Sequence, residues 1–87
     1  MSRRRTDEVI AEAEVVTIGE LVRLSGMRYS TLKYYSEIGL LPFAQEEEGL
    51  TRRYRREPAL LRLEEISRLR NEGLSLSEIG EHFASLT

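Results

Sequence analysis

Two groups of side chains in this sequence carry the charges and hydrogen-bond donors that binding to an anionic polymer requires. The first is Lys33-Tyr34-Tyr35. The Lys33 ammonium can neutralise a phosphate or donate to a guanine edge, and the Tyr34 hydroxyl can donate to a backbone while its ring packs beside a sugar. The alternative for both is an ordinary surface residue. For Tyr35 the favoured role is structural, with the ring buried under a helix.

The second group consists of arginines. Residues 49–56 contain four of them and no acid: Arg52, Arg53, Arg55 and Arg56. Charges packed this densely repel one another unless an anion gathers them, so Arg52 and Arg53 are interpreted as phosphate-binding, while Arg55 and Arg56 stay open. The chain has a net charge of −2, but residues 26–62 hold seven Lys/Arg and five Asp/Glu, which is 7 − 5 = +2. The distribution of charge, more than its sum, allows a nucleic-acid partner.

The composition excludes several other kinds of site. The 87 residues contain no cysteine, so disulfides, Cys-ligated zinc, iron–sulfur clusters and thiol redox sensing are excluded. His82 is the one histidine and makes no credible metal site. The sequence shows no phosphate loop, nucleophile–base pair or carboxylate dyad, so an enzyme is not expected. We expect no cofactor, no metal and no small-molecule effector. No apolar run approaches the ~20 residues that span a bilayer, so we expect a cytoplasmic protein without a membrane partner.

Two short helices must position the first group. Thr17 and Glu20 have the capping-box spacing, which predicts a helix from residue 18 to about 25 that ends at Gly26. A second helix is predicted over residues 29–38, and the short turn between the two matches helix-turn-helix geometry. A helical hairpin that merely packs also fits this spacing. On the second helix, the side facing the first is predicted to hold Leu32, Tyr35 and Ile38. The outward side holds Ser30, Lys33, Tyr34 and Glu37, with Thr31 at its edge, and its N-terminal half is small, polar or cationic, as in a helix that enters a major groove.

The arginines fall on a predicted β-hairpin. Residues 40–45 and 50–55 are two short extended runs around the polar, glycine-ended turn Glu46-Glu47-Glu48-Gly49. Alternation places Arg53 and Arg55 on one face of the second strand, and Arg52 and Tyr54 on the other. A hairpin of this size is marginal alone, so we expect it to pack on the helices as a wing. Its acidic tip would be repelled by DNA, and only the arginine strand and its flanks are expected to make contact.

The rest of the chain is predicted to complete a small helical domain. Residues 1–14 are expected to form a flexible tail with at most an unstable helical turn or two, and Val15-Val16 to form a very short strand. A third helix over residues 58–72 is expected to start with Pro58 in its first position. Its apolar stripe comprises Leu60, Leu61, Leu63, Ile66 and Leu69. Ser75-Leu76-Ser77-Glu78 is a second capping box, which opens a last helix with Leu76, Ile79 and Phe83 facing inward.

Taken in order, these motifs resemble the DNA-binding domain of the MerR family. The resemblance runs from about Val16 to Phe83. It rests on Ile18-Gly19-Glu20-Leu21, Ser25-Gly26-Met27, Ser30-Thr31-Leu32-Lys33-Tyr34-Tyr35 with Ile38-Gly39-Leu40-Leu41, Gly49 with Arg52-Arg53-Tyr54, and Gly73-Leu74-Ser75-Leu76-Ser77-Glu78-Ile79. Each motif alone is weak, whereas their order and spacing together are specific.

The resemblance implies a mainly α fold, a winged helix-turn-helix with four short helices and a two-stranded β-hairpin wing, in residues 15–87. It implies double-stranded DNA as the partner, with helix 29–38 in the major groove and the wing, residues 42–56, along the backbone. The residues expected at the DNA are Arg28, Ser30, Thr31, Lys33, Tyr34, Tyr35, Arg52, Arg53 and Tyr54.

Three features depart from the family pattern. Arg28 stands where a small capping residue is common, Thr51 lies where the wing usually has an aromatic, and the long dimerisation helix and effector domain have no counterpart in this sequence. We therefore expect a sequence-specific DNA-binding protein, a transcriptional regulator that works without an inducer. Adequate affinity would then come from cooperative binding on repeated sites, from pairing of two copies, or from further chain.

Two alternatives remain open. One is an excisionase or DNA-packaging accessory protein. The other is a protein-interaction module that reuses the fold, which the net acidity and the Glu46–Glu48 tip favour a little.

Overall fold

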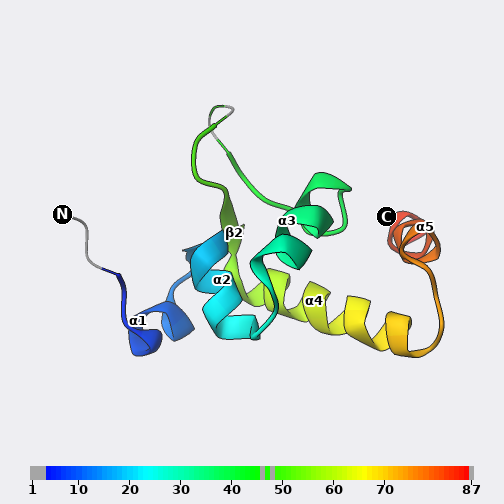
Figure 1. The fold of residues 1–87 in the computed structure, drawn as a ribbon, viewed down its shortest axis with the longest axis horizontal. Coiled ribbons are helices and arrows are strands. Elements are labelled where there is room, and N and C mark those ends of the chain that lie inside the picture. Colours follow the sequence, from blue (N-terminus) through cyan, green and yellow to red (C-terminus); the bar gives the residue numbers. More distant parts are fainter. Residues whose placement is uncertain (1–3, 46, 48, 87) are drawn as a thin grey trace.

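The structure is a computed structural model that describes residues 4–45, 47 and 49–86. Within these residues the chain forms five helices and two strands (Figure 1). In chain order they are α1 (Asp7–Glu12), β1 (Val15–Thr17), α2 (Ile18–Ser25), α3 (Tyr29–Glu37), β2 (Arg53–Arg55), α4 (Arg56–Asn71) and α5 (Leu76–Ala84). The fold is a winged helix-turn-helix, as expected, with one helix more than the four anticipated. None of the helices in the described part is both long and apolar enough to cross a membrane.

The helix-turn-helix formed by α2 and α3 confirms the sequence prediction closely. Thr17 accepts a hydrogen bond from the backbone N–H of Glu20 at 3.2 Å, and the Glu20 carboxylate accepts one from the N–H of Thr17 at 2.9 Å. This reciprocal capping satisfies two backbone donors that the first turn of α2 leaves free. Gly26 ends α2 with φ of 73°, a left-handed conformation that glycine adopts without strain. The chain then turns directly into α3.

The inward side of α3 differs from the prediction at its last position. Leu32 and Tyr35 are buried, but Ile38 is 43% exposed because α3 ends at Glu37 and the chain turns away at Gly39, whose φ is 84°. Ser36 takes an inward place instead. Its hydroxyl donates a hydrogen bond to the carbonyl of Leu32 at 2.8 Å. A buried serine in a helix commonly satisfies its hydroxyl donor in this way.

The strand pairing also differs from the prediction. β2 pairs with β1 in an antiparallel two-stranded sheet, in which Val15 lies opposite Arg55 and Thr17 opposite Arg53. The wing hairpin is reduced to a single bridge, with two hydrogen bonds between Ala44 and Arg53 at 2.8 and 2.9 Å. A wing strand of three residues gains more from the buried sheet edge beside α2 than from its hairpin neighbour, since a lone hairpin buries little apolar surface. The predicted acidic tip includes Glu46 and Glu48, which lie outside the described residues.

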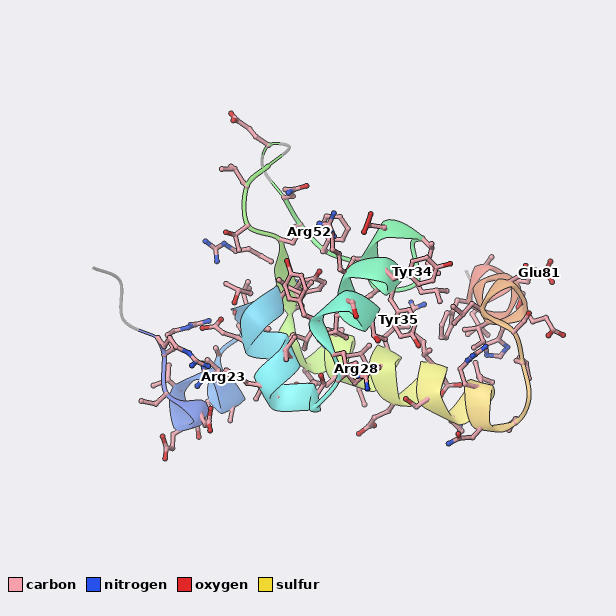
Figure 2. All side chains as sticks on the ribbon, viewed as in Figure 1. Arg23, Arg28, Tyr34, Tyr35, Arg52 and Glu81 are labelled. Carbon is pink, nitrogen blue, oxygen red and sulfur yellow. The ribbon has the colours of Figure 1, made fainter. Side chains whose placement is uncertain are left out.

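The expectation of a flexible tail over residues 1–14 is not matched by the segment from residue 4 onward. Thr6 caps α1, and Ile10 on that helix is fully buried in the core. The Arg5 guanidinium donates to both carboxylate oxygens of Glu20, at 2.6 and 2.7 Å, and Arg23 reaches from α2 to Asp7 at 2.6 Å (Figure 2). The hydrogen bonds from Arg5, together with those from Thr17, lower the pKa of Glu20 from 4.5 to about 2. One buried isoleucine and two ion pairs therefore dock the N-terminal segment on α2. Arg3, with Met1 and Ser2, lies outside the described residues.

The two C-terminal helices follow the prediction with two exceptions. α4 starts at Arg56, so Pro58 occupies its third position and not its first; proline is tolerated there because first-turn N–H groups have no helical acceptor. Leu61, predicted to be inward, is 59% exposed, whereas Leu63, Ile66 and Leu69 are buried. The capping box of α5 is confirmed, with Glu78 accepting from the N–H of Ser75 at 2.9 Å.

A single core joins the elements around the middle of α4. Its fully buried large side chains include members of α1, β1, α2, α3, β2, α4 and α5: Ile10, Val16, Leu21, Leu32, Tyr54, Ile66 and Ile79. In Figure 1, α4 runs along the long axis, with α2 and α3 on one side and α5 at its far end, and the wing loop projects at the top of the view beyond β2. The helix-turn-helix and the wing are thus supported by the same helix.

Candidate nucleic-acid interface

The exposed face of α3 carries the side chains expected at DNA. Ser30, Lys33 and Tyr34 are exposed, with Tyr34 at 52%, and Thr31 is half-buried at the edge. The first turn of α3 contains no acidic residue. A face of this kind can approach base edges and phosphates without electrostatic repulsion.

Arg28 stands just before this face. It is the N-cap residue of α3 and its side chain makes no capping hydrogen bond, which fits the departure noted in the sequence. Its carbonyl accepts from the N–H groups of Thr31 and Leu32 at 3.1 and 3.2 Å, so the backbone completes the first turn. The exposed guanidinium lies at the start of α3 (Figure 2).

A groove of about 520 Å³ joins α3 to the wing. Tyr29 and Lys33 line it from α3, and Arg52 lines it from the wing together with neighbouring wing residues Gln45, Gly49, Leu50 and Thr51. The Gln45 amide donates to the carbonyl of Leu50 at 2.5 Å and closes the base of the wing loop. The two cationic groups that the sequence predicted at DNA, Lys33 and Arg52, therefore border one concave surface.

A chain of contacts sets the wing relative to α3. The Arg52 guanidinium lies over the Phe43 ring, 4.8 Å from its centroid, and that ring packs at 6.0 Å against Tyr54. The Tyr54 hydroxyl contacts the Ser36 hydroxyl at 2.7 Å, and Ser36 in turn bonds the carbonyl of Leu32. Since Ser36 uses its one proton on that carbonyl, Tyr54 is the donor to Ser36. The orientation of Arg52 thus depends on groups inside α3.

Three of the predicted contact residues lie elsewhere. Tyr54 is fully buried and Tyr35 is 9% exposed, so neither side chain is available to a ligand on the surface. For Tyr35 this agrees with the structural role that the sequence favoured; for Tyr54 the prediction of a direct contact is wrong. Arg53 is exposed but does not line the Lys33 groove; it lines two hollows with Val15, one of which shares Gln45, Leu50 and Thr51 with that groove. Alternation along the chain points Arg52 and Arg53 to different sides.

The sequence reasoning missed Tyr29. This residue is 54% exposed and lines the groove with Lys33. A signal was present, because residues four apart on a helix share a face and Lys33 had already been singled out. Thr51 and Gln45 were also missed as groove residues, because their positions depend on how the wing loop closes.

A helix-turn-helix whose second helix borders a cationic groove with a wing defines the class of winged helix-turn-helix DNA-binding domains. The model of the MerR helix-turn-helix family of regulatory proteins matches residues 16–86, and the chain belongs to that family. The match begins at β1 and therefore leaves out α1.

Curated relatives agree with this family. The chain is 39% identical over 75 residues to the HTH-type transcriptional activator SoxR homolog of Chromobacterium violaceum, which covers 86% of this chain and 49% of that protein. It is 40% identical over 62 residues to the nodulation protein NolA of Bradyrhizobium elkanii, covering 71% of this chain and 28% of NolA. The chain thus spans about half or less of the length of these relatives. No solved structure gave a significant match.

Proposed function

We propose that this chain binds double-stranded DNA as a transcriptional regulator, with α3 in the major groove and the wing on the backbone. The observation that carries the proposal is the groove shared by Tyr29, Lys33 and Arg52. A duplex that receives α3 in its major groove brings the flanking phosphate strand to the side of that helix, which is where the wing supplies Arg52.

The proposed contacts divide into positioning and reading. Lys33 and Arg52 neutralise phosphates, and Arg28 adds a cation at the start of α3. Ser30, Tyr34 and Tyr29 offer hydroxyl groups that can bond a base edge or a phosphate. Phosphate contacts fix orientation without reading sequence, so specificity is assigned to the exposed face of α3.

One copy of the chain makes a small interface. A single DNA-binding module of this size buries roughly 600–1,000 Å² of protein surface. We therefore propose that two copies act together on a regulatory site.

The salt dependence of DNA binding tests the phosphate contacts. On a mixed-sequence 20-base-pair duplex, Lys33→Gln and Arg52→Gln should each reduce the slope of log K against log salt by about 0.9. Arg70→Gln is the matched control, because Arg70 is an exposed arginine near the end of α4 and lines no part of the groove. A slope that neither Lys33→Gln nor Arg52→Gln changes would refute this assignment.

A second measurement tests whether α3 reads sequence. Selection from a random duplex pool should return a defined site, and Ser30→Ala should relax the preference there while leaving the salt slope unchanged. Recovery of no preferred sequence would restrict the function to non-specific or architectural DNA binding, as in an accessory protein.

A further inference from the structure

A hollow of about 470 Å³ lies between the wing base, β2 and the start of α4. Its apolar lining includes Val15, Phe43 and Pro58, and its charged lining consists of Arg53, Arg55 and Arg62. None of the described residues that line it is acidic. We call it the β2–α4 hollow. It shares no lining residue of the described chain with the α3 groove.

The size and apolar lining of the β2–α4 hollow suit a small organic molecule. Pockets for such molecules have volumes of about 300–1,000 Å³ and apolar walls with a few polar groups. Val15 and Phe43 remain 39% and 37% exposed there, so part of their apolar surface is free to be covered. The sequence had indicated no small-molecule effector. The residues of the hollow are distant in sequence, and Val15 reaches it only through the pairing of β1 with β2.

Two arginines of the hollow lack an acidic partner. Among the described residues, neither Arg53 nor Arg62 forms an ion pair. The Arg62 guanidinium lies over the Phe83 ring, 3.9 Å from its centroid. Stacking occupies the flat face of a guanidinium and leaves the N–H donors in its plane available. Two guanidinium groups at an apolar wall without a carboxylate favour an anion between them.

Arg55 is in a different position, because acidic residues stand beside it. Glu12, Glu14 and Glu57 line an adjoining hollow that shares Arg55 and Pro58 with this one. Arg55 reaches Glu14 at 3.3 Å, although both side chains are more than 70% exposed and the pair is weak. An anion in the β2–α4 hollow is therefore favoured on the side of Arg53 and Arg62, away from these carboxylates.

We propose that the β2–α4 hollow binds a small aromatic carboxylate. The ring of the ligand packs against Val15, Phe43 and Pro58, and its carboxylate accepts hydrogen bonds from Arg53 and Arg62. Guanidinium groups bind carboxylates with paired, charge-assisted hydrogen bonds, whereas an inorganic anion would leave the apolar wall uncovered. The site goes beyond the proposed function, since it lies outside the groove assigned to DNA.

A titration of the isotope-labelled chain with naphthoate, followed by NMR, tests the site. Saturable binding with a Kd of about 1 mM or tighter is expected for a ligand of this size. The amide signals of Val15, Ala44 and Arg53 should shift, and those of Tyr29 and Lys33 in the α3 groove should not. No saturable binding in the millimolar range, or shifts confined to the α3 groove, overturns the proposal.

Two analogues separate the contributions of charge and ring. Naphthalenemethanol keeps the ring without the charge and should bind at least about tenfold more weakly, because it loses the charge-assisted hydrogen bonds. Inorganic phosphate keeps the charge without the ring and should also bind more weakly. An alcohol as tight as naphthoate rejects the arginine contacts, and phosphate as tight as naphthoate rejects the ring contacts.

Variants test the two arginines. Arg53→Gln should weaken naphthoate binding about tenfold, and it should fold normally, because no hydrogen bond or ion pair of the described chain includes the Arg53 side chain. Arg62→Gln should act in the same way, once thermal melting shows that loss of the Phe83 contact leaves it folded. Arg70→Gln is the matched control, an exposed arginine of α4 that does not line the hollow. An affinity that Arg53→Gln leaves unchanged overturns the proposal.

The DNA variants keep this inference separate from the proposed function. Lys33→Gln should bind naphthoate as tightly as the wild-type chain, because Lys33 lines the α3 groove alone of the two. A chain that binds DNA with the expected salt slopes but does not bind naphthoate rejects the β2–α4 hollow alone. A chain that binds naphthoate, but whose DNA slope is unchanged by Lys33→Gln and Arg52→Gln, rejects the DNA contacts alone.

Discussion

The buried hydrogen bond between Tyr54 of the wing strand and Ser36 of α3 gives the sharpest test of how the wing is held. The two hydroxyl oxygens are 2.7 Å apart, and Ser36 donates onward to Leu32 at 2.8 Å. Tyr54 is fully buried and Ser36 is 4% exposed, so water does not replace either partner. The perturbation is a double-mutant cycle of Tyr54→Phe, Ser36→Ala and the two together.

The magnitudes follow from which group each change leaves unpaired. Tyr54→Phe removes the donor, while the Ser36 hydroxyl keeps its bond to the carbonyl, so a cost of about 1 kcal/mol is expected. Ser36→Ala leaves the Tyr54 hydroxyl in the core without its hydrogen-bond partner, which costs about 1–3 kcal/mol. The better helix propensity of alanine offsets at most about 0.5 kcal/mol of this. The double variant leaves no hydroxyl group unpaired. It should therefore cost less stability than the sum of the two single variants, with a coupling energy of about 1–2 kcal/mol.

Urea unfolding followed by circular dichroism measures all four proteins, and a small single domain should unfold in one step. In thermal melts each kcal/mol corresponds to about 4–8 °C in Tm for a chain of this size. Tyr34→Phe is the matched control, because that tyrosine is 52% exposed and should change stability by less than about 0.5 kcal/mol. Additive single effects, with coupling below about 0.5 kcal/mol, would refute the hydrogen bond as the link between wing and α3.

Further predictions concern the N-terminal segment and the helix-turn-helix. Because hydrogen bonds from Arg5, together with those from Thr17, lower the pKa of Glu20 from 4.5 to about 2, the stabilisation is present above pH 4.5 and is lost as the pH falls toward 2. Arg5→Gln should therefore lower the urea midpoint at pH 6 and lower it progressively less toward pH 3; an equal loss at both would contradict the ion pair. Ile10→Ala should cost about 2–5 kcal/mol in urea unfolding, against under about 1 kcal/mol for its exposed neighbour in Val9→Ala, and equal small effects would mean that α1 is not docked. Gly26→Ala should cost about 1–2 kcal/mol from its left-handed backbone alone, because a Cβ there meets nothing within 4 Å; a neutral result would argue against the φ of 73°.

The local parts of the fold could be predicted because their causes lie within a few residues. Both capping boxes, at Thr17 and Ser75, were visible as a Thr or Ser three residues before a Glu, and both are formed. The end of α2 at Gly26 has an equally local cause. At these positions, the cause of a helix start or end lies in adjacent residues, and the structure agrees with the prediction from the sequence.

The strand pairing could not be predicted in the same way. Val15 pairs with Arg55, which lies forty positions further along the chain (55 − 15 = 40), and nothing near Val15 indicates which strand it will join. The pattern around residues 40–55 correctly indicated extended chain, but it favoured the nearest partner. The docking of α1 was not predicted for the same reason. A six-residue helix is not stable alone, and contacts of Ile10 and Arg5 with distant residues stabilise it.

The same long-range pairing decides what each wing arginine can do. From the sequence, Arg52 and Arg53 were both interpreted as phosphate-binding, and the roles of Arg55 and Arg56 stayed open. Pairing with β1 buries Tyr54 and leaves Arg53 and Arg55 on the solvent face beside Val15, while Arg52 stays with Lys33. Arg52, just before the strand, and Arg53, within it, thereby point to different sides, and Arg52→Gln should reduce the salt slope of DNA binding more than Arg53→Gln does. An equal reduction by the two variants would return Arg53 to the proposed DNA contacts.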